Sequence, residues 1–313
     1  MNIRNNRDGF TFIELLFVII IMGIVGGIAL EAIRQYYNNI FRTQEITKRV
    51  AEADHILEQL SKYFETAISS SIVNFDKNGV ATGCEGPPIA GDLNDYTVAF
   101  VAADMDSFYG LNGRPGWSEE VRLLTNNDIN ASDANFTAAD AIINALGGST
   151  LRNSAIYDAD SVDVAACTRF NWNGLGTAGY HMMSTAANPT SDTIVRLNND
   201  NNATDGRRKY LIRTGYAFKV STDGNFTMYS NFYPWQGGRY DTALNRKQNL
   251  LAQNVAHFYA DYNASDYQND PSLNDRGMVW RLKVCMRGLD ANLSNSDAPG
   301  QDICRERRVH VRY

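Results

Sequence analysis

The sequence predicts an α+β fold in which a long N-terminal α-helix packs on a C-terminal antiparallel β-sheet, with a loop-rich insertion between them. Three observations predict it. No Gly or Pro interrupts the chain between Gly27 and Gly79, and its apolar residues recur at helical spacing. From Tyr210 onward, apolar residues alternate with polar ones at a period of two, which is typical of strands. The intervening residues 102–209 are rich in Asp, Asn, Ala and Gly.

The first element is an apolar run from Phe10 to Leu30 that holds one charge, Glu14, and follows a basic leader containing Arg4 and Arg7. At about 1.5 Å per residue, this run makes a helix of roughly 30 Å, which matches the hydrocarbon thickness of a bilayer. A secretory signal has a shorter apolar centre of about 7–15 residues followed by a small-residue cleavage site. We therefore predict a membrane-spanning helix over residues 10–30.

The residues Gly9, Phe10 and Glu14 resemble the N-terminus of type IV pilins and pseudopilins. In that family a prepilin peptidase cuts after the Gly, the next residue becomes a methylated N-terminus, and a Glu stands fifth after the cut. The resemblance implies a pilin-like fold, removal of leader residues 1–9, and a single-pass anchor in the bacterial inner membrane with the head in the periplasm. It also implies later assembly with other pilin or pseudopilin subunits into a pilus or pseudopilus.

Glu14 would be costly in the membrane, because a carboxylate in hydrocarbon costs about 2.5–3.5 kcal/mol on insertion scales. The partner that the resemblance implies is the freed amine of Phe10 in a neighbouring subunit. The alternative is that Glu14 lies near the membrane interface and is hydrated there. Many family members have a Pro just past the apolar run, where this chain has Glu31, so we expect no proline kink.

The second half of the helix, residues 31–72, is predicted to be amphipathic, within one helix from about Phe10 to Ser70. Its apolar residues follow a spacing of four and three that makes a single stripe: Ile46, Val50, Ala53, Leu57, Leu60, Phe64 and Ala67. Such a stripe could be a coiled-coil seam, but it is short and precedes a strand-rich region. We therefore expect the stripe to pack against a sheet.

Residues 73–209 are predicted to be a loop-rich variable region. Residues 74–92 read as loop and residues 96–101 as a short strand. The remainder, 102–209, is expected to form surface loops and short elements, with one clear helix over 138–146. Thr137 and Asp140 predict a capping box at the start of that helix.

Residues 210–313 are predicted to form one antiparallel sheet with a face toward the long helix. Strands are expected over 210–220 and 226–233, joined by a turn at Asp223-Gly224, and over 254–262, 278–287 and 307–313. This part weakly resembles minor pilins of the PilW type and the J-type pseudopilin of type II secretion. The length of the chain favours the first.

The composition argues against a nucleic-acid partner, because the net charge is −6 and becomes −7 when a leader with two arginines and one aspartate is removed. One basic cluster, formed by Arg305, Arg307, Arg308 and Arg312, alternates with apolar residues near the C-terminus. We interpret it as a strand with a solvated face. A DNA-binding patch is the alternative.

The four cysteines are Cys84, Cys167, Cys285 and Cys304. In an oxidising exported compartment an even number predicts two disulfides, with three possible connectivities. Cys285 and Cys304 are close in sequence and both lie in predicted strands, so we pair them with each other, and Cys84 with Cys167 by default. A metal site is disfavoured because no C-x-x-C pattern or histidine cluster accompanies the cysteines.

Six Asn-x-Ser/Thr patterns without an intervening Pro occur, at Asn130, Asn135, Asn202, Asn225, Asn263 and Asn292. An Asp stands two residues before each of them. The extended pattern resembles the acceptor of a bacterial oligosaccharyltransferase that needs an acidic residue there. We expect the six acceptors to lie in loops or turns and to be glycosylated, and a coincidence of a polar composition is the alternative.

We find no motif of an enzyme or a cofactor site. The four histidines, His55 on the helix, His181 in a loop, and His257 and His310 in strands, do not form a triad with other residues. The oxygen-bearing residues Asp200, Asn202, Thr204, Asp205 and Gly206 depart from the EF-hand pattern, so no cofactor is expected and calcium is only a weak possibility.

The sequence therefore predicts a structural subunit: a minor pilin or pseudopilin that joins or primes a type IV pilus or a type II secretion pseudopilus. Its expected partners are other pilin subunits, prepilin peptidase and the inner membrane, with an oligosaccharyltransferase as a further one. The alternative is a tip adhesin whose residues 102–209 recognise a surface or DNA.

Overall fold

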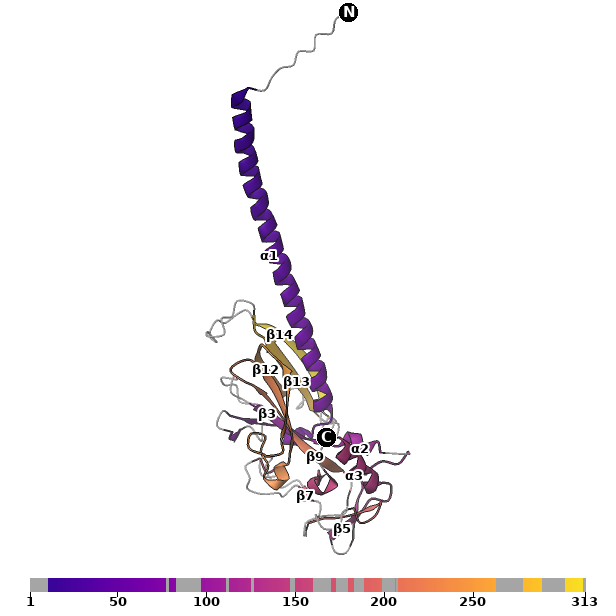
Figure 1. Ribbon diagram of the computed structural model, residues 1–313. Coiled ribbons are helices and arrows are strands. Elements are labelled where there is room, and N and C mark those ends of the chain that lie inside the picture. Colours follow the sequence, from indigo (N-terminus) through magenta and orange to yellow (C-terminus); the bar gives the residue numbers. More distant parts are fainter. Residues whose placement is uncertain are drawn as a thin grey trace, which may run out of the picture. The chain divides into compact units, whose positions relative to one another are not determined.

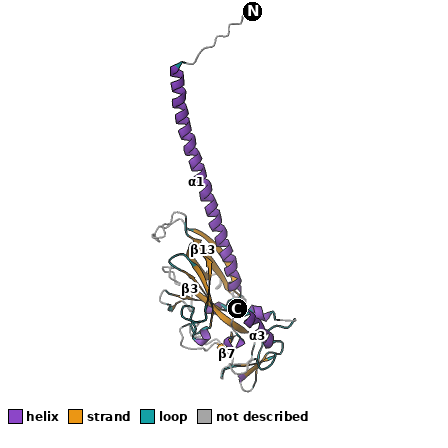
Figure 2. Ribbon diagram, viewed as in Figure 1, coloured by secondary structure: helices purple, strands orange, loops and turns teal. Residues whose placement is uncertain are grey.

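The structure is a computed structural model of the chain. It describes residues 11–76, 79–82, 97–110, 113–124, 127–146, 150–159, 170–172, 180–182, 189–198, 206, 208–262, 278–288 and 302–311. The chain divides into two units, residues 1–49 and residues 50–313. Each unit is considered by itself below (Figures 1 and 2).

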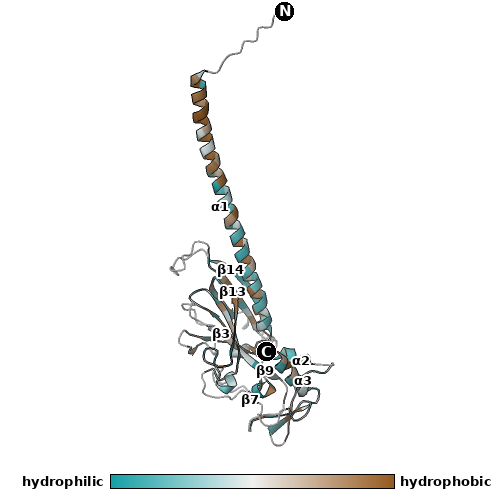
Figure 3. Ribbon diagram, in the orientation of Figure 1, coloured by the Kyte–Doolittle hydropathy of each residue, from teal (hydrophilic) through white to brown (hydrophobic). Residues whose placement is uncertain are grey.

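The helix α1, Phe12–Glu65, is continuous over 54 residues, or about 80 Å at the usual rise. No Pro lies within it, in agreement with the expectation of no proline kink. It ends five residues before the predicted Ser70, and a 3-10 turn, η1 (Ser69–Ser71), follows. Figure 3 shows that its N-terminal turns are almost wholly hydrophobic, whereas its later turns mix hydrophobic and hydrophilic residues.

In its described residues the second unit contains three antiparallel sheets, and the largest of them has eight strands. Its main path runs β11-β10-β9-β3-β1-β2, and β6 and β7 extend it from β9. The strands are β1 (Val73–Phe75), β2 (Ala81–Thr82), β3 (Thr97–Ala103), β6 (Ala155–Asp158), β7 (Tyr180–Met182), β9 (Lys209–Val220), β10 (Phe226–Phe232) and β11 (Lys247–Ala252). The predicted hairpin is confirmed as β9 and β10, and Gly224 adopts the positive φ that its turn requires.

The central strand β3 is buried along its whole length. Val98, Phe100 and Ala102 point into the cluster that includes α1, whereas Ala99 and Val101 point into a second cluster on the opposite face. A strand covered on both faces has no polar alternation, and the sequence Thr-Val-Ala-Phe-Val-Ala-Ala shows none after its first residue. The predicted contact of one sheet face with the long helix is confirmed, and the second cluster covers the opposite face.

The stripe on α1 packs on this sheet as predicted, and the burial begins at Ala53. Leu60 and Phe64 are fully buried, and the Phe64 ring lies 4.7 Å from that of Phe100, measured between ring centroids. Ile46, at the start of the predicted stripe, is 40% exposed. It belongs to the first unit.

The C-terminal strands form a separate three-stranded sheet. The prediction of one sheet over residues 210–313 was therefore wrong. The order of the separate sheet is β12 (Val255–Tyr262), β13 (Met278–Met286) and β14 (Ile303–Val311). Asn254, at positive φ, lies between β11 and β12, where the chain leaves one sheet for the other. The inner face of this sheet packs against α1, since Trp280, Leu282 and Val284 of β13 belong to the same core cluster as the α1 residues.

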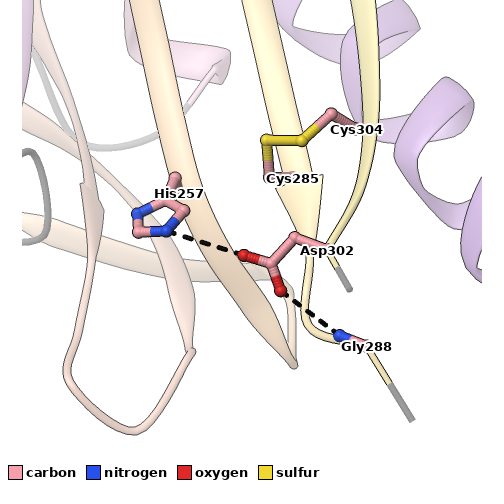
Figure 4. The surroundings of a disulfide bond; sticks show 5 residues. All are labelled: His257, Cys285, Gly288, Asp302 and Cys304. Atoms are coloured by element: carbon pink, nitrogen blue, oxygen red, sulfur yellow. Dashed lines mark hydrogen bonds and ion pairs between the residues drawn. A yellow bond between two sulfur atoms is a disulfide. The ribbon is translucent and has the colours of Figure 1, made fainter. Parts of the chain in front are cut away.

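The predicted disulfide between Cys285 and Cys304 is confirmed (Figure 4). The two residues are direct cross-strand partners in β13 and β14. The pairing continues to Met286 and Ile303, so β14 starts four residues earlier than predicted. Beside the disulfide, Asp302 lies between His257 Nε2, at 3.6 Å, and the Gly288 amide, at 3.3 Å. Cys84 and Cys167 lie outside the described residues.

Residues 102–209 contain the expected short elements but are not confined to the surface, because they supply 17 of the 29 buried residues described in the second core cluster. Their short elements are α2 (Met105–Phe108), α3 (Phe136–Ala145), η4 (Leu151–Asn153), and a third sheet of β4 (Arg122–Leu123), β5 (Asp128–Asn130) and β8 (Ile194–Arg196). Trp117, Phe136 and Trp172 are buried there. The Trp117 and Trp172 indoles donate to the carbonyls of Asp104 and Ser71, which joins this region to the large sheet.

The helix α3 begins at Phe136, and its N-cap is Asn135, not the predicted Thr137. The Asn135 side chain accepts a hydrogen bond of 2.9 Å from the amide of Ala138. Asp140, assigned to a capping box from the sequence, instead accepts from the Leu151 amide at 2.7 Å. Two further expectations were wrong: residues 74–92 include β1 and β2, and His181 lies in β7.

Candidate assembly site at the start of the helix

The first turn of α1 carries Glu14 in a side-chain cap. Thr11 precedes the helix, and Glu14 is its third residue, which is the spacing of a T-x-x-E capping box. Glu14 Oε2 accepts from the Thr11 amide and from Thr11 Oγ1, both at 3.2 Å. Within the described residues both bonds use the same carboxylate oxygen, so Oε1 keeps its lone pairs there for another donor.

The surface around Glu14 is apolar on every side of the helix. Glu14 is the only charged residue between Phe12 and Leu30, and the large apolar side chains of this segment are all exposed within the chain. A helix that is apolar all round is stable only when something outside it removes that surface from water. Gly9 and Phe10, the predicted cleavage site and new N-terminus, lie outside the described residues.

A second apolar surface lies beyond the predicted membrane span, still within the first unit. A groove of about 450 Å³ is lined by Tyr36, Asn39, Ile40, Thr43, Gln44 and Thr47. Thr43 Oγ1 donates to the Asn39 carbonyl at 2.8 Å, and Thr47 Oγ1 donates to the Thr43 carbonyl at 2.9 Å. Because these hydroxyl hydrogens are used within the helix, the groove presents mainly methyl and ring surface.

The second unit, residues 50–313, is called the head below. It contains buried charges that the sequence did not predict. Lys209 and Asp158 form an ion pair whose side chains are 2% and 4% exposed. Asp104, also buried, lies 3.5 Å from Arg213 Nε and accepts a 2.6 Å hydrogen bond from Ser107 Oγ. Burial raises the pKa of the Asp104 carboxyl, and the nearby Arg213 charge opposes this rise. Burial also raises the pKa of Tyr216 to about 12.

Asp104 and Arg213, together with Tyr216, line a small cavity of about 170 Å³ next to the end of α1, whereas Lys209 and Asp158 are not among its lining residues. Each charge has a partner of opposite sign, and in the part of the chain that the structure describes no group of three or more His, Cys, Asp or Glu residues is placed to hold a metal. The residues considered for calcium lie outside the described residues, except Gly206. The buried pairs therefore read as structural.

The basic residues of β14 lie on an exposed edge strand. Residues 304–308 are exposed, whereas Val309 and Val311 are buried, as predicted for a strand with a solvated face. Arg305 Nε lies 3.7 Å from Asp54 Oδ1 on α1, and Arg307 lines a groove with Asp54 and Glu58. Acidic groups of the helix thus offset part of the positive charge. Arg312 lies outside the described residues.

Three of the six acceptor asparagines lie in the described part of the chain. Asn135 caps α3, and Asn225 closes the hairpin turn between β9 and β10, where its carbonyl accepts from the Ser221 amide. Asn130 lies in strand β5, so the expectation of a loop was wrong there, because three residues are too few to show a periodic pattern in the sequence. Asn202, Asn263 and Asn292 lie outside the described residues.

Comparison with known families gives one match. Residues 4–30 match the family described as the prokaryotic N-terminal methylation motif. Within the described residues, α1 is long and apolar enough to cross a membrane, as judged by its length and composition. Neither the curated proteins nor the solved structures that were compared gave a match. The motif supports a pilin-like or pseudopilin subunit of type IV pili or type II secretion, processed by prepilin peptidase and assembled with other pilin subunits.

Proposed function

We propose that this chain is a minor pilin or pseudopilin that is cut after Gly9, held in the inner membrane by residues 10–30, and joined to its neighbours through that same helix, with the head in the periplasm. One observation carries the proposal. Residues 12–30, which lie within the segment that matches the methylation motif, form a helix with no apolar residue buried by its own chain and with a single carboxylate, Glu14.

The exposed apolar surface needs two successive environments. Before assembly, the acyl chains of the bilayer can cover residues 12–30, whose length fits the hydrocarbon core. In a fibre outside the membrane, only the helices of neighbouring subunits can cover the same residues. The helix is therefore suited to leave one apolar environment for another, as assembly of a pilus from membrane-held subunits requires.

Glu14 provides the specificity that an apolar surface lacks. Lipid-like surfaces pack with little preference for register, whereas a carboxylate in apolar surroundings strongly prefers a position next to a positive charge. Its contacts with Thr11 occupy one oxygen and supply no charge. We infer that the freed amine at Phe10 of a neighbouring subunit supplies that charge and sets the register between adjacent helices.

The matched experiment compares Glu14→Ala, Glu31→Ala and Thr11→Ala in full-length chain. Glu14→Ala should lower incorporation into sheared fibres by about tenfold or more, the effect of losing roughly 1.4 kcal/mol of pairing, while membrane insertion stays unchanged. Glu31→Ala removes a carboxylate at the end of the apolar run and should have little effect. Thr11→Ala removes a partner of Glu14 within the cap, and it should also incorporate normally.

Either of two results would contradict the pairing. Normal incorporation of Glu14→Ala would show that the charge does not set register. Equal losses with Thr11→Ala and Glu14→Ala would show that the carboxylate acts through its own helix cap. Chain length favours the PilW type of minor pilin over the J-type pseudopilin, and the position of the subunit in sheared fibres, tip or shaft, can be measured by immunogold labelling in the same experiment.

A further inference from the structure

The asparagines of this chain divide sharply by what stands two residues before them. Of the 32 asparagines, six begin an Asn-x-Ser/Thr pattern without Pro, and all six have Asp at that position. Of the other 26, only two have it, Asn78 and Asn94. If Asp were placed without regard to the pattern, the two groups would have similar frequencies. A general richness in Asp and Asn therefore does not explain the association.

A seventh Asn-x-Thr pattern supports the same conclusion. Asn188-Pro189-Thr190 contains the Pro that makes such a pattern unusable as an acceptor, and Ala186, not Asp, stands two residues before Asn188. The acid thus accompanies the six usable acceptors and is missing from the unusable one. This is expected when one enzyme must read the Asp, the Asn and the hydroxyl residue together.

We propose that the head carries N-linked oligosaccharides on these asparagines, and that Asn130, Asn135 and Asn225 receive them before the head folds. The donor is an oligosaccharide linked to a polyprenyl diphosphate. Asn Nδ2 forms a bond to C1 of the first sugar and loses a proton, while the bond between C1 and the diphosphate oxygen breaks and the lipid diphosphate leaves. No oxidation or reduction is involved.

At Asn130 the fold engages the acidic residue of the acceptor. Asp128 accepts two hydrogen bonds from Arg196, at 2.8 Å from Nε and 3.2 Å from Nη2, across the pair of strands β5 and β8. A bidentate pair of this kind occupies both carboxylate oxygens. An enzyme that reads the acid must compete with Arg196 in the folded head, but it meets no such competition in the unfolded chain.

At Asn135 the fold engages the acceptor amide itself. Its Oδ1 accepts from the Ala138 amide, so the side chain is fixed over the first turn of α3. Phe136, between Asn135 and Thr137, is buried, which holds the three residues of the pattern in a helix start instead of an extended chain. The capping bond uses Oδ1 and leaves Nδ2 as the atom that carries a sugar, so a glycan added earlier is compatible with the cap.

At Asn225 the fold hides the hydroxyl residue. Thr227 is 7% exposed within β10, and Phe226 beside it is fully buried. Asn225 itself is half-buried in the turn, where its backbone N–H donates a hydrogen bond of 3.1 Å to Ser221 Oγ. A transferase that contacts Asn225 and Thr227 together would require β10 to detach from the sheet. Each described acceptor is therefore blocked at a different one of its three elements, and unfolding frees all three.

The first test is glycopeptide mass analysis of the full chain produced in its own host, with two variants at Asn135. Asp133→Ala removes the acid and Thr137→Ala removes the hydroxyl; both residues are exposed, so the head should fold in both variants. We expect a sugar on Asn135 in the unaltered chain and a loss of about tenfold or more in each variant. An unmodified mass at all six asparagines would overturn the proposal, and a sugar retained in Asp133→Ala would overturn the role of the acid.

The second test concerns the order of folding and modification. Full chain made without the transferase is offered in detergent, either native or unfolded in urea and diluted, to membranes that contain the transferase and its lipid-linked donor. We expect Asn130, Asn135 and Asn225 to be modified at least about tenfold faster in the unfolded chain. Equal rates would overturn the proposed order. The inference needs the head to be exported but not the fibre, so a failure of the Glu14 experiment would leave it unaffected.

Discussion

The two halves of α1 show how one helix can be made for two different environments. In residues 12–37 the large apolar side chains lie on all sides and are exposed within the chain. From Ala53 to Phe64 the apolar residues form one stripe, and the sheets of the head cover it. The backbone is helical throughout, so the difference lies only in how the apolar residues are distributed around the axis.

This difference shows where the stability of each half comes from. The later half is stabilised by contacts inside its own chain, so its substitution should change the unfolding of the head. Among the described residues of the earlier half no apolar side chain is buried. Under the proposed function this half depends on lipid or on other subunits, so its substitution should change insertion or assembly instead. Matched substitutions in the two halves can test this separation directly.

The largest effect is expected from Phe64→Ala, compared with Phe41→Ala on the same helix. Phe64 is fully buried against Phe100 and Trp280, whereas Phe41 is 66% exposed. Truncating a buried Phe usually costs about 3–5 kcal/mol, so Phe64→Ala should lower the free energy of unfolding of the head by about 4 kcal/mol. Phe41→Ala should change it by less than about 0.5 kcal/mol.

The measurement is urea unfolding of the full chain in detergent, followed by tryptophan fluorescence, since the four tryptophans all lie in the head. A second assay measures incorporation into fibres, which tests the earlier half of the helix. Phe41→Ala should reduce this incorporation. A loss of head stability in Phe41→Ala similar to that in Phe64→Ala would show that the two halves do not depend on separate environments.

The next largest effect is expected from Lys209→Met, which tests what the head requires of its buried charges. The substitution keeps most of the side-chain volume but leaves Asp158 buried beside no lysine. Breaking a buried pair in this way costs about 3–5 kcal/mol, and we expect about 3 kcal/mol by the same urea measurement. The control is the double variant Lys209→Met with Asp158→Leu, which should regain most of the loss. A double variant as unstable as the single one would contradict the assignment.

Much of this architecture could be predicted from the sequence because its signals are local. The apolar run from Phe12 to Leu30, the stripe through Leu57 and Phe64, and the hairpin around Asp223-Gly224 each follow from spacing within a few residues. The pair Cys285 and Cys304 was also correctly assigned, because both residues lie on neighbouring strands.

The rest depends on contacts between residues far apart in the sequence. Nothing near Trp117 or Trp172 indicates that their indoles reach carbonyls 13 and 101 residues away, so residues 102–209 read as loops although they form part of the core. Deleting them, an obvious test of an adhesin role, would remove that core. The buried partners Asp158 and Lys209 are likewise ordinary charged residues until the fold brings them together.

At the candidate assembly site, Glu14 was predicted from its isolation among apolar residues, but its bonds to Thr11 were not. The T-x-x-E spacing is the local signal from which these bonds could have been predicted. At α3 the reverse happened, because Thr137 and Asp140 resembled a capping box while Asn135 makes the cap. Capping patterns overlap within two residues, so spacing alone does not fix the first residue of a helix.

A smaller effect is expected in the pH dependence of the head, through Asp104. Its pKa is raised by burial, so the folded state holds this proton to a higher pH than the unfolded state. Its contribution to stability is therefore fully present below the ordinary pKa of 3.8 and is lost as the pH rises through the raised value. Asp104→Asn should lack this loss, so the stability of the unaltered head relative to the variant should fall as the pH rises above about 4.

The matched variant is Ser107→Ala, which removes the 2.6 Å hydrogen bond that favours the charged form of Asp104. It should raise the pKa of Asp104 further, so the fall in stability should be larger in total and extend to higher pH, as measured by urea unfolding at a series of pH values. A stability difference between the unaltered chain and Asp104→Asn that does not change with pH would contradict the assigned shift.

The smallest effect is expected from Arg305→Ala, at the edge where β14 faces the acidic side of α1. Arg305 and Asp54 are 46% and 60% exposed and 3.7 Å apart, and exposed pairs of this kind contribute about 0–1 kcal/mol. We expect a loss below about 0.5 kcal/mol that disappears in 1 M salt, because exposed charges are screened there.

The same variant separates the two interpretations of the basic strand. If β14 bound DNA, Arg305→Ala would weaken DNA retention at low salt while leaving unfolding unchanged. We expect no salt-dependent DNA retention by the unaltered chain either, since Asp54 and Glu58 already lie beside the arginines and the head is acidic overall.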